Sequence, residues 1–467
     1  MTGGRPRLSR AALRAVRPEY LDWLPGPDTG VGIVHLGIGA FHRAHQAVFT
    51  QLAMAAEPGD WAICGISQRH GAVGDALRPQ DCLYTVAERG ADEDRIRVVG
   101  SVREVLLAPR QPEHVTDRLS HPDTRVVSIT VTEAGYHDEL IGQLVRGLAA
   151  RRDRAGDAGL TVLSCDNLPD NGPLVARLVR GFCARLPDGD GLAAWIDRNV
   201  TFPSTVVDQI VPAATDADRR DVADRLGLTD LGAVVAEPHR QWVIEDRFAG
   251  PHPAWEKVGV RLVADIAPHQ AAKLRLVNGT HSALAYLGLL AGCRTTAEVT
   301  AREEFAGFAR ALIQRETGAS LSRFGMTVTE TDVEHLLGRL GNRRITHRLS
   351  QIAAQGPRKL PHRLLEPAAE LLVSGAEPRL ICVALAGWLT HLRRAAPGPD
   401  EQSARLRRIM AGADGADRIV AAVLDAWPGA PAALRASAAF RAMLADALDK
   451  LARDGAATTV RRYARPR

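Results

Sequence analysis

Hydrophobic residues follow two different periods along the chain. In the first half, short runs rich in β-branched residues alternate with segments whose apolar positions recur at helical spacing. Strands are predicted at residues 31–36, 61–66, 125–132 and 160–164, and a helix at 41–54. Strands that alternate with helices are typical of a mainly parallel sheet covered on both faces.

The second half has helical periodicity almost throughout. From about Pro268 onward, β-rich runs nearly vanish, and short Gly/Pro breaks separate the predicted helices at 273–290, 303–314, 379–393 and 432–452. The sequence therefore predicts an α/β domain over residues 1–267, followed by a mainly α-helical domain over residues 268–467.

Composition narrows the class of protein. Of the 467 residues, 46% are hydrophobic and 24% are charged, which is typical of a globular protein. The net charge of +5 is spread along the chain, and aromatic residues are only 4%, so we expect no nucleic-acid partner. The one dense basic run is interpreted as a solvated tail and consists of Arg461, Arg462, Arg465 and Arg467.

The cysteines and the apolar runs indicate the compartment. Six cysteines are scattered without a CxxC pair, which favours a reduced, intracellular protein. The N-terminus has no apolar leader, and no apolar run is long enough to span a bilayer. We therefore expect a cytoplasmic protein with no membrane partner.

A glycine-rich turn follows the first predicted strand, where a dinucleotide fingerprint belongs. Gly37 would permit the tight turn, and Gly39 would let the backbone approach a pyrophosphate held at a helix N-terminus. The third glycine of the fingerprint is replaced by His42, so a turn without a ligand is the alternative. The predicted cofactor contacts are Gly37, Ile38, Gly39, Ala40 and Phe41.

The end of the second predicted strand lacks a carboxylate. An NAD site usually carries Asp or Glu there to bind the ribose hydroxyls, but this strand runs into Ser67, Arg69 and His70. Ser67 and Arg69 are therefore candidate cofactor contacts that would also accept a 2′-phosphate. We expect NAD as the cofactor, with NADP left open.

Three histidines near this turn raise the question of a metal. His42 and His45 would share a helix face near His35, but no carboxylate or cysteine completes a ligand set. We expect polar contacts at the helix end and no metal.

The candidate catalytic residues open the second half. In an α-helix, Asn278 would lie about 140° and His281 about 80° round from Lys273, so all three fit one broad face. Only four of the 59 basic residues are lysines, and lysine, unlike arginine, can lose its proton when desolvated. The alternative is a surface lysine with a structural histidine. Gly279 in mid-helix costs about 1 kcal/mol relative to Ala, which indicates a close backbone approach.

These residue types suit hydride transfer to a carbonyl, which builds negative charge on the oxygen. Asn278 would stabilise that charge, together with Asn167 in the asparagine-rich segment 164–172. Lys273 would move the proton, and His281 would hold a neighbouring hydroxyl.

With these residues in view, the chain resembles the mannitol dehydrogenase family of polyol-specific long-chain dehydrogenases, which includes fructuronate reductase. The matching segments are 33–46 (IVHLGIGAFHRAHQ), 130–136 (TVTEAGY), 164–172 (SCDNLPDNG), 202–212 (FPSTVVDQIVP), 237–248 (EPHRQWVIEDRF) and 273–282 (KLRLVNGTHS). The resemblance implies an N-terminal Rossmann-like doubly wound domain, a helical C-terminal domain, an active site between them and catalysis without a metal. It also places the catalytic Lys-x4-Asn-x2-His on Lys273, Asn278 and His281, with Asn167 as the second oxyanion donor.

The resemblance further implies substrate contacts at Asp208 and Lys359. Two departures stand out: Gln270 occupies the position of a proton-relaying glutamate, and Gln351 that of an arginine in the mannitol-oxidising members. Gln351, together with the sequences around Arg240, Arg275 and Lys359, favours D-mannonate and D-fructuronate as the substrate pair. Arg240 and Lys359 are the predicted partners of the substrate carboxylate.

Several alternatives stay open. Arg240 and Arg275 would instead pair with structural acids such as Glu245 or Asp246, and the segment 454–459 is more similar to the mannitol enzymes. Mannitol 2-dehydrogenase activity is therefore the second hypothesis, and a non-catalytic sugar- or nucleotide-binding regulator is the third. In each case the expected partner is a small sugar acid or polyol.

Overall fold

The computed structural model describes residues 5–132, 135–394 and 400–465. Glu133 and Ala134 of the segment 130–136, and Arg467 of the basic tail, lie outside these residues. The chain divides into two compact units, Met1–Ile266 and Ala267–Arg467.

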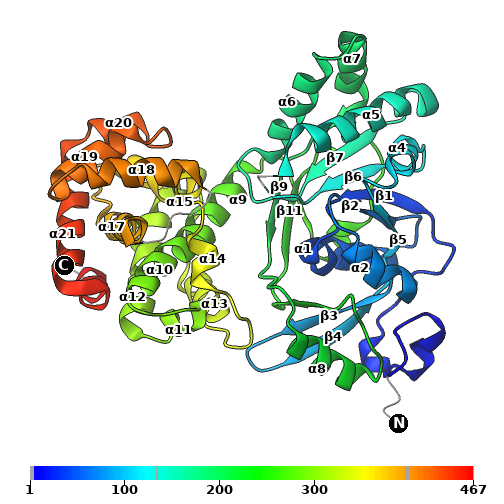
Figure 1. Cartoon of the computed structure of the whole chain (residues 1–467), viewed down its shortest axis with the longest axis horizontal. Helices are drawn as coiled ribbons and strands as arrows, with labels where there is room; N and C mark the ends of the chain where they lie inside the picture. The colour runs from blue at the N-terminus through cyan, green and yellow to red at the C-terminus, as the bar shows by residue number, and fades with distance from the viewer. Residues whose placement is uncertain (1–4, 133–134, 395–399, 466–467) are drawn as a thin grey trace. The chain divides into compact units, whose positions relative to one another are not determined.

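The first unit is built on a six-stranded parallel sheet with the order β5-β2-β1-β6-β7-β8 (Figure 1). The order reverses at β1, as it does in the Rossmann sheet, where dinucleotides bind at the carboxyl ends of the strands. The strands are β1 Val31–Leu36, β2 Ala62–Ser67, β5 Val102–Leu107, β6 Val126–Ile129, β7 Leu160–Ser164 and β8 Val200–Thr201.

Both faces of this sheet are covered, because successive side chains of a strand point to opposite faces. In β1, Ile33 belongs to one buried cluster and Val34 to the other. Helices α4 to α7 cover the Val34 side, and α1 and α2 lie on the Ile33 side (Figure 1). The predicted doubly wound Rossmann-like fold is thus confirmed. The helices are α1 Ala40–Ala44, α2 Gln46–Ala56, α3 Ala72–Leu77, α4 Pro112–Ser120, α5 Asp138–Ala155, α6 Asn171–Cys183, α7 Gly189–Asn199 and α8 Asp216–Leu226.

The helix predicted at 41–54 is interrupted. Its backbone leaves helical geometry at His45, with φ −107° and ψ −89°. The buried His45 ring stacks on Phe41, and its Nε2 lies 2.8 Å from the Gln241 carbonyl oxygen. This tertiary contact holds His45 outside the helix and leaves α1 only five residues long.

Two three-stranded sheets complete the first unit, with the orders β10-β3-β4 and β12-β11-β9. Neither was predicted from the sequence. The strands of the second sheet have at most five residues, whereas β3 and β4 have six each and lie only four residues apart. The strands of both sheets are β3 Tyr84–Arg89, β4 Asp94–Val99, β9 Thr205–Asp208, β10 Val234–Ala236, β11 Gln241–Glu245 and β12 Arg261–Val263, with short 3-10 turns η1 Ala11–Ala15, η2 Pro18–Tyr20, η3 Arg78–Gln80 and η5 Trp255–Val258.

The described residues of the second unit form helices and connecting loops, with one isolated bridge between Thr295 and Arg348. Helix α17 packs against α10 and α21, and all three contribute to one large apolar core. Three π-turns interrupt the helices: η6 Lys273–Asn278, η7 Ile313–Thr317 and η9 Pro361–Leu365. The remaining elements are α9 Ala267–Ala272, α10 Gly279–Leu290, α11 Thr296–Thr300, α12 Glu303–Leu312, η8 Ala319–Phe324, α13 Glu330–Leu340, α14 Leu349–Ala353, α15 Gly356–Leu360, α16 Glu366–Val373, α17 Arg379–Arg394, α18 Glu401–Ala411, α19 Ala416–Ala426, α20 Ala432–Ala436 and α21 Ala438–Ala464.

All six cysteines are buried as free thiols. Burial raises the pKa of each thiol above its ordinary value. None of the helices in the described ranges has the length and apolar character that crossing a bilayer requires.

Candidate active site

The turn after β1 requires glycine at its first position. Gly37 has a φ of 101°, and a Cβ added there would lie 2.1 Å from the Thr130 carbonyl oxygen. Its N–H donates to the Ile66 carbonyl oxygen at 2.8 Å, so the turn is tied to the end of β2. Gly37 therefore brings the chain close to β2 and β6, at the point where the strand order reverses.

The rest of the turn is more open. Gly39 is exposed, and a Cβ added there would meet only the Gly37 carbonyl oxygen, at 3.8 Å. Ala40 and Phe41 are partly exposed, whereas Ile38 is buried against Gly65. Packing within the first unit thus does not require glycine at Gly39, and the predicted close approach of a ligand supplies a reason for it.

His42, at the position of the missing third glycine, is fully buried. Its ring stacks on that of His35 in β1, with 3.4 Å between the ring centroids, and its Nδ1 lies 3.2 Å from Gln46 Oε1. His35 in turn lies 2.7 Å from Ser128 Oγ and 3.2 Å from the Gly37 carbonyl oxygen. Burial lowers the pKa of His35 to about 3 and that of His42 well below its ordinary value, so a neutral network supports the turn.

The end of β2 carries the predicted ribose contacts. The Ser67 hydroxyl donates to the His70 carbonyl oxygen at 2.6 Å, and Arg69 is exposed. Since β2 is the neighbour of β1, this loop lies beside the glycine turn. A role in binding the ribose stays a prediction.

Asn167 lies exposed in a tightly held loop after β7. The buried Asn171 amide reaches the carbonyl oxygens of Ser164, Asp166 and Thr205 at 3.0 to 3.1 Å. This side chain fixes the far end of the loop and joins it to β9.

Asp166 fixes the near end of the same loop. Its buried carboxylate accepts hydrogen bonds from the backbone N–H groups of Val131 and Thr132 at 3.0 and 2.9 Å, and from the Tyr136 hydroxyl at 2.8 Å. Burial raises the pKa of Asp166. Asp166 and Tyr136 were not among the predicted site residues, although both lie within the segments that carry the family resemblance.

Asp208 ends β9 and is buried. Its Oδ2 lies 3.5 Å from Nε2 of His239, in the segment before β11. The role of Asp208 toward substrate stays a prediction.

Arg240 does not have the surroundings expected of a substrate ligand. Its Nη2 donates to Glu88 Oε1 at 2.5 Å, its Nε donates to the Ala44 carbonyl oxygen at 3.0 Å, and its guanidinium lies over the Phe49 ring. The charge is therefore already balanced by a carboxylate within the first unit. This geometry favours the structural alternative, with Glu88 as the partner in place of Glu245 or Asp246.

Arg275 is likewise paired with a carboxylate of its own unit. It forms a bidentate pair with Glu370 at 2.6 and 2.8 Å and also donates to Ser320. The expectation that Arg275 favours a carboxylate substrate thus loses its support.

Lys273 and Asn278 meet across the π-turn η6. Lys273 Nζ donates to Asn278 Oδ1 at 2.9 Å, and both side chains are buried. In the predicted α-helix these residues would lie well apart round the axis, whereas the i to i+5 spacing of a π-turn brings them together.

The other end of the Asn278 amide has no partner. Nδ2 is buried, and the described residues offer it no hydrogen-bond acceptor. Leaving a buried donor unsatisfied costs about 1–3 kcal/mol. Such a donor beside a lysine is therefore suited to an oxygen supplied by a ligand.

His281 lies in the first turn of α10 and is buried. Its ring is 5.1 Å from that of His347, at an interplanar angle of 73°. Burial, with a further contribution from the positive charge of Lys273, lowers the pKa of His347 to about 4, so His347 is neutral near pH 7. Sequence analysis did not identify His347, because it lies far along the chain in a segment without clear periodicity.

Lys359 is partly exposed in α15, directly before η9. η9 packs against η6, and Arg363 of η9 donates to Ser282 Oγ at 3.0 Å. A Cβ added at Gly279 would lie 3.0 Å from the Arg363 carbonyl oxygen, so the predicted close approach at Gly279 is present.

Within the described ranges, no group of three or more His, Cys, Asp or Glu side chains is arranged to hold a metal ion. The neighbouring His35 and His42 are instead committed to the stacked network below the glycine turn.

The first unit has a sheet in the Rossmann order, with a glycine turn where the order reverses. The second unit holds a lysine–asparagine pair. Together these features define a dehydrogenase that uses a nicotinamide cofactor. Family comparison agrees with this class. Residues 31–257 match the mannitol dehydrogenase Rossmann domain, and residues 265–452 match the mannitol dehydrogenase C-terminal domain. The chain belongs to the mannitol dehydrogenase family.

Individual relatives span most of the chain. The D-mannonate oxidoreductase of Escherichia coli is 39% identical over 429 residues, covering 83% of this chain and 87% of the relative. Mannitol dehydrogenase 2 of Saccharomyces cerevisiae is 38% identical over 397 residues, covering 78% and 79%. The structure of Pseudomonas fluorescens mannitol 2-dehydrogenase in complex with NAD and D-mannitol has a TM-score of 0.85 and 31% identity, covering 98% of this chain and 99% of that one.

Proposed function

We propose that this chain is an NAD-dependent dehydrogenase that interconverts a secondary alcohol and a ketone on an open-chain sugar acid or polyol. The observation that carries the proposal is the Lys273–Asn278 pair, with Nζ 2.9 Å from Oδ1 and a buried Nδ2 that has no described acceptor. Together these groups offer a proton acceptor and an oxyanion donor on adjacent turns.

The glycine turn fits a dinucleotide. Gly37 has a conformation and a backbone approach that a side chain would block, and Gly39 leaves room over the turn. The five-residue α1 supplies less helix dipole than the long helix predicted from the sequence. The pyrophosphate would therefore depend mainly on the turn's own backbone, with Ser67 and Arg69 near the ribose. When bound, NAD supplies the hydride acceptor for alcohol oxidation.

Residues of both units have proposed roles toward the hydroxyl proton and the carbonyl oxygen of the substrate. Lys273 takes the hydroxyl proton as the hydride leaves the same carbinol carbon, so the alcohol loses two electrons and two hydrogens and becomes a ketone. Asn278 Nδ2 and Asn167 stabilise the charge that develops on the oxygen. His281 holds a neighbouring hydroxyl, and Asp208 and Lys359 contact the rest of the substrate.

For the substrate pair we propose D-mannonate and D-fructuronate. The support comes from Gln351, which stands where the mannitol-oxidising members have arginine, from Lys359, and from the similarity to a D-mannonate oxidoreductase. Arg240 and Arg275 no longer contribute, since Glu88 and Glu370 hold them. Lys359 is thus the principal proposed partner of the substrate carboxylate.

Mannitol and fructose form the second candidate pair. The observation in its favour is the likeness along nearly the whole chain to a mannitol 2-dehydrogenase crystallised with D-mannitol.

The test is kcat/KM for fructuronate and for fructose under identical conditions. A carboxylate site should favour fructuronate by well over tenfold, because each charge-assisted hydrogen bond contributes about 1.5–3 kcal/mol. Lys359→Met should remove most of that advantage, whereas the control Lys257→Met, at an exposed lysine paired with Glu57, should not. Equal or reversed preference in the wild type would favour the mannitol pair.

A further inference from the structure

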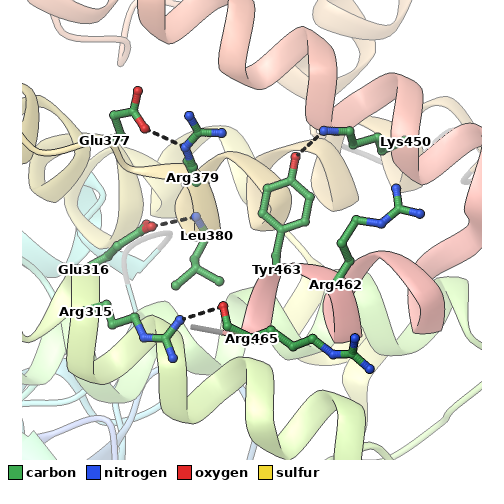
Figure 2. A pocket seen from close by; sticks show the side chains of 9 residues that line it. All are labelled: Arg315, Glu316, Glu377, Arg379, Leu380, Lys450, Arg462, Tyr463 and Arg465. Carbon is green, nitrogen blue, oxygen red and sulfur yellow. Dashed lines mark hydrogen bonds and ion pairs between the residues drawn. The ribbon is translucent and has the colours of Figure 1, made fainter. Parts of the chain in front are cut away.

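A cavity lies within the helical unit, and neither Lys273 nor Asn278 is among its lining residues. It has a volume of about 470 Å³, and its lining comes from π-turn η7, from the start of α17 and from the end of α21 (Figure 2). The lining residues are Arg315, Glu316, Glu377, Arg379, Leu380, Lys450, Arg462, Tyr463 and Arg465. Ligand cavities commonly have volumes of about 300–1,000 Å³.

The lining is strongly basic. Four arginines and one lysine face two carboxylates, those of Glu316 and Glu377. The tail was predicted to be solvated, yet Arg462 and Arg465 line a cavity with Arg315 and Arg379 from distant parts of the chain. Both side chains are exposed, as a solvated tail predicts, but their convergence with guanidinium groups of other elements is also typical of an anion site.

Three of the five cations are paired. Arg379 contacts Glu377 at 2.6 Å, Lys450 contacts Asp446 at 2.6 Å, and Arg462 contacts Asp454 at 2.8 Å. These pairs hold the three side chains in place round the cavity, and Figure 2 draws the pair of Arg379 with Glu377.

Two cations remain in excess. Within the described part of the chain, Arg315 and Arg465 have no acidic partner, and Arg315 Nη1 only donates to the Arg465 carbonyl oxygen at 3.3 Å. The nearby Glu316 does not neutralise them well, because its two carboxylate oxygens accept the N–H groups of Leu380 and Ile381, each at 2.7 Å, at the start of α17.

We propose that this cavity binds a phosphate-bearing small molecule. The guanidinium fork matches phosphate oxygens in pairs, and Arg315 and Arg465 would supply it. Arg379 and Lys450 lie round the same space and carry further N–H groups beyond those in their ion pairs (Figure 2). None of its lining residues is a proposed dehydrogenase residue, and the proposal does not depend on their function.

The experiment is calorimetric titration of the full-length chain with inorganic pyrophosphate and, in parallel, with citrate at the same ionic strength. The test variant is Arg315→Gln/Arg465→Gln. The matched control is Arg405→Gln/Arg408→Gln, which removes the same charge from exposed positions of α18. Thermal unfolding checks that each variant folds.

We expect pyrophosphate to bind the wild type and the control within twofold of each other, and to bind the test variant at least tenfold more weakly. Absence of binding to the wild type, or equal weakening in both double variants, would overturn the proposal. Equal affinity for citrate would overturn the assignment to phosphate. If the test variant does not fold, Arg315→Lys/Arg465→Lys keeps the charge but removes the fork, and unchanged affinity there would likewise overturn it.

Discussion

In the carboxamide of Asn278, Oδ1 has a hydrogen-bond partner and the buried Nδ2 has none among the described residues. Its oxygen accepts a hydrogen bond from Lys273, which fixes the rotation of the amide, and its Nδ2 donor is left unsatisfied. The lysine thus orients the donor before any substrate arrives. Preorganised donors of this kind stabilise developing charge more effectively than mobile ones.

Removal of the lysine should affect chemistry more than cofactor binding. Lys273→Ala is expected to lower kcat by at least about 100-fold, the lower end for general acid–base catalysis. The NAD dissociation constant should change little, since the turn that carries Gly37 is in the other unit. Steady-state kinetics and NAD titration check this, with Lys257→Ala as the control. Near-normal turnover would remove Lys273 from the mechanism.

Asn278→Asp keeps the shape and the lysine contact but replaces the open donor with an acceptor. A carboxylate oxygen would repel the charge that develops on the substrate oxygen, so kcat should fall by roughly 100- to 1,000-fold, as when one oxyanion donor is lost. Comparison with Asn278→Ala separates repulsion from simple loss. If the aspartate variant is the more active of the two, Nδ2 is not the oxyanion donor.

At the scale of elements, sequence periodicity located helices and strands but not their irregularities. The strands at 31–36 and 160–164 have the predicted bounds, because continuous apolar runs fix buried parallel strands. The break at His45 and the π-turn at Lys273–Asn278 were not predicted. Both arise from contacts with distant segments, which a local pattern does not contain.

Glu316, whose carboxylate accepts N–H groups at the start of α17, allows the effect of burial on a pKa to be tested. Burial raises the pKa of Glu316 to about 7, whereas a glutamate in an unfolded chain titrates near ~4.3. Glu316 is protonated in both states at low pH and ionised in both above the higher pKa. The folded state is therefore penalised as the pH rises from about 4 through about 7.

Glu316→Gln should remove this penalty. The free energy of unfolding of the wild type, relative to that of the variant, should decrease between pH 5 and pH 8, by an amount on the order of 3 kcal/mol. Denaturant unfolding at several pH values measures the difference. Glu303→Gln, an exposed glutamate in the first turn of α12, should show almost no such trend. A pH-independent difference for Glu316→Gln would contradict the raised pKa.

At the scale of the whole molecule, the fold was more predictable than the partners of individual charges. Alternating strands and helices, followed by helices alone, predicted both the sheet and the helical unit. The same sequence did not reveal that Glu88 holds Arg240 or that Glu370 holds Arg275, because each pair is separated by about a hundred residues or more. Asp166 and Tyr136 were missed although only 30 residues separate them, because their hydrogen bond forms between loops that follow neighbouring strands of the sheet.

Cofactor binding should appear in the thermal stability of the whole chain. NAD at 100 times its dissociation constant stabilises a protein by about 2.7 kcal/mol, so it should raise the melting temperature. Gly37→Ala should abolish this shift, because its Cβ would meet the Thr130 carbonyl oxygen.

Gly156→Ala is the matched control for that variant. Gly156 also has a positive φ, of 57°, but a Cβ added there has no neighbour within 4 Å among the described residues. It should lower the melting temperature through backbone strain alone and keep the NAD-induced shift. Retention of the shift in Gly37→Ala would place the dinucleotide elsewhere.

The burial of all six cysteines has a practical consequence. Their thiols are shielded, and their raised pKa values leave little thiolate at neutral pH, so maleimide reagents should react slowly with the native protein. A single cysteine introduced at an exposed position, such as that of Arg408, would then take up a fluorophore or spin label selectively. Site-specific spectroscopy is therefore accessible without first removing the native thiols.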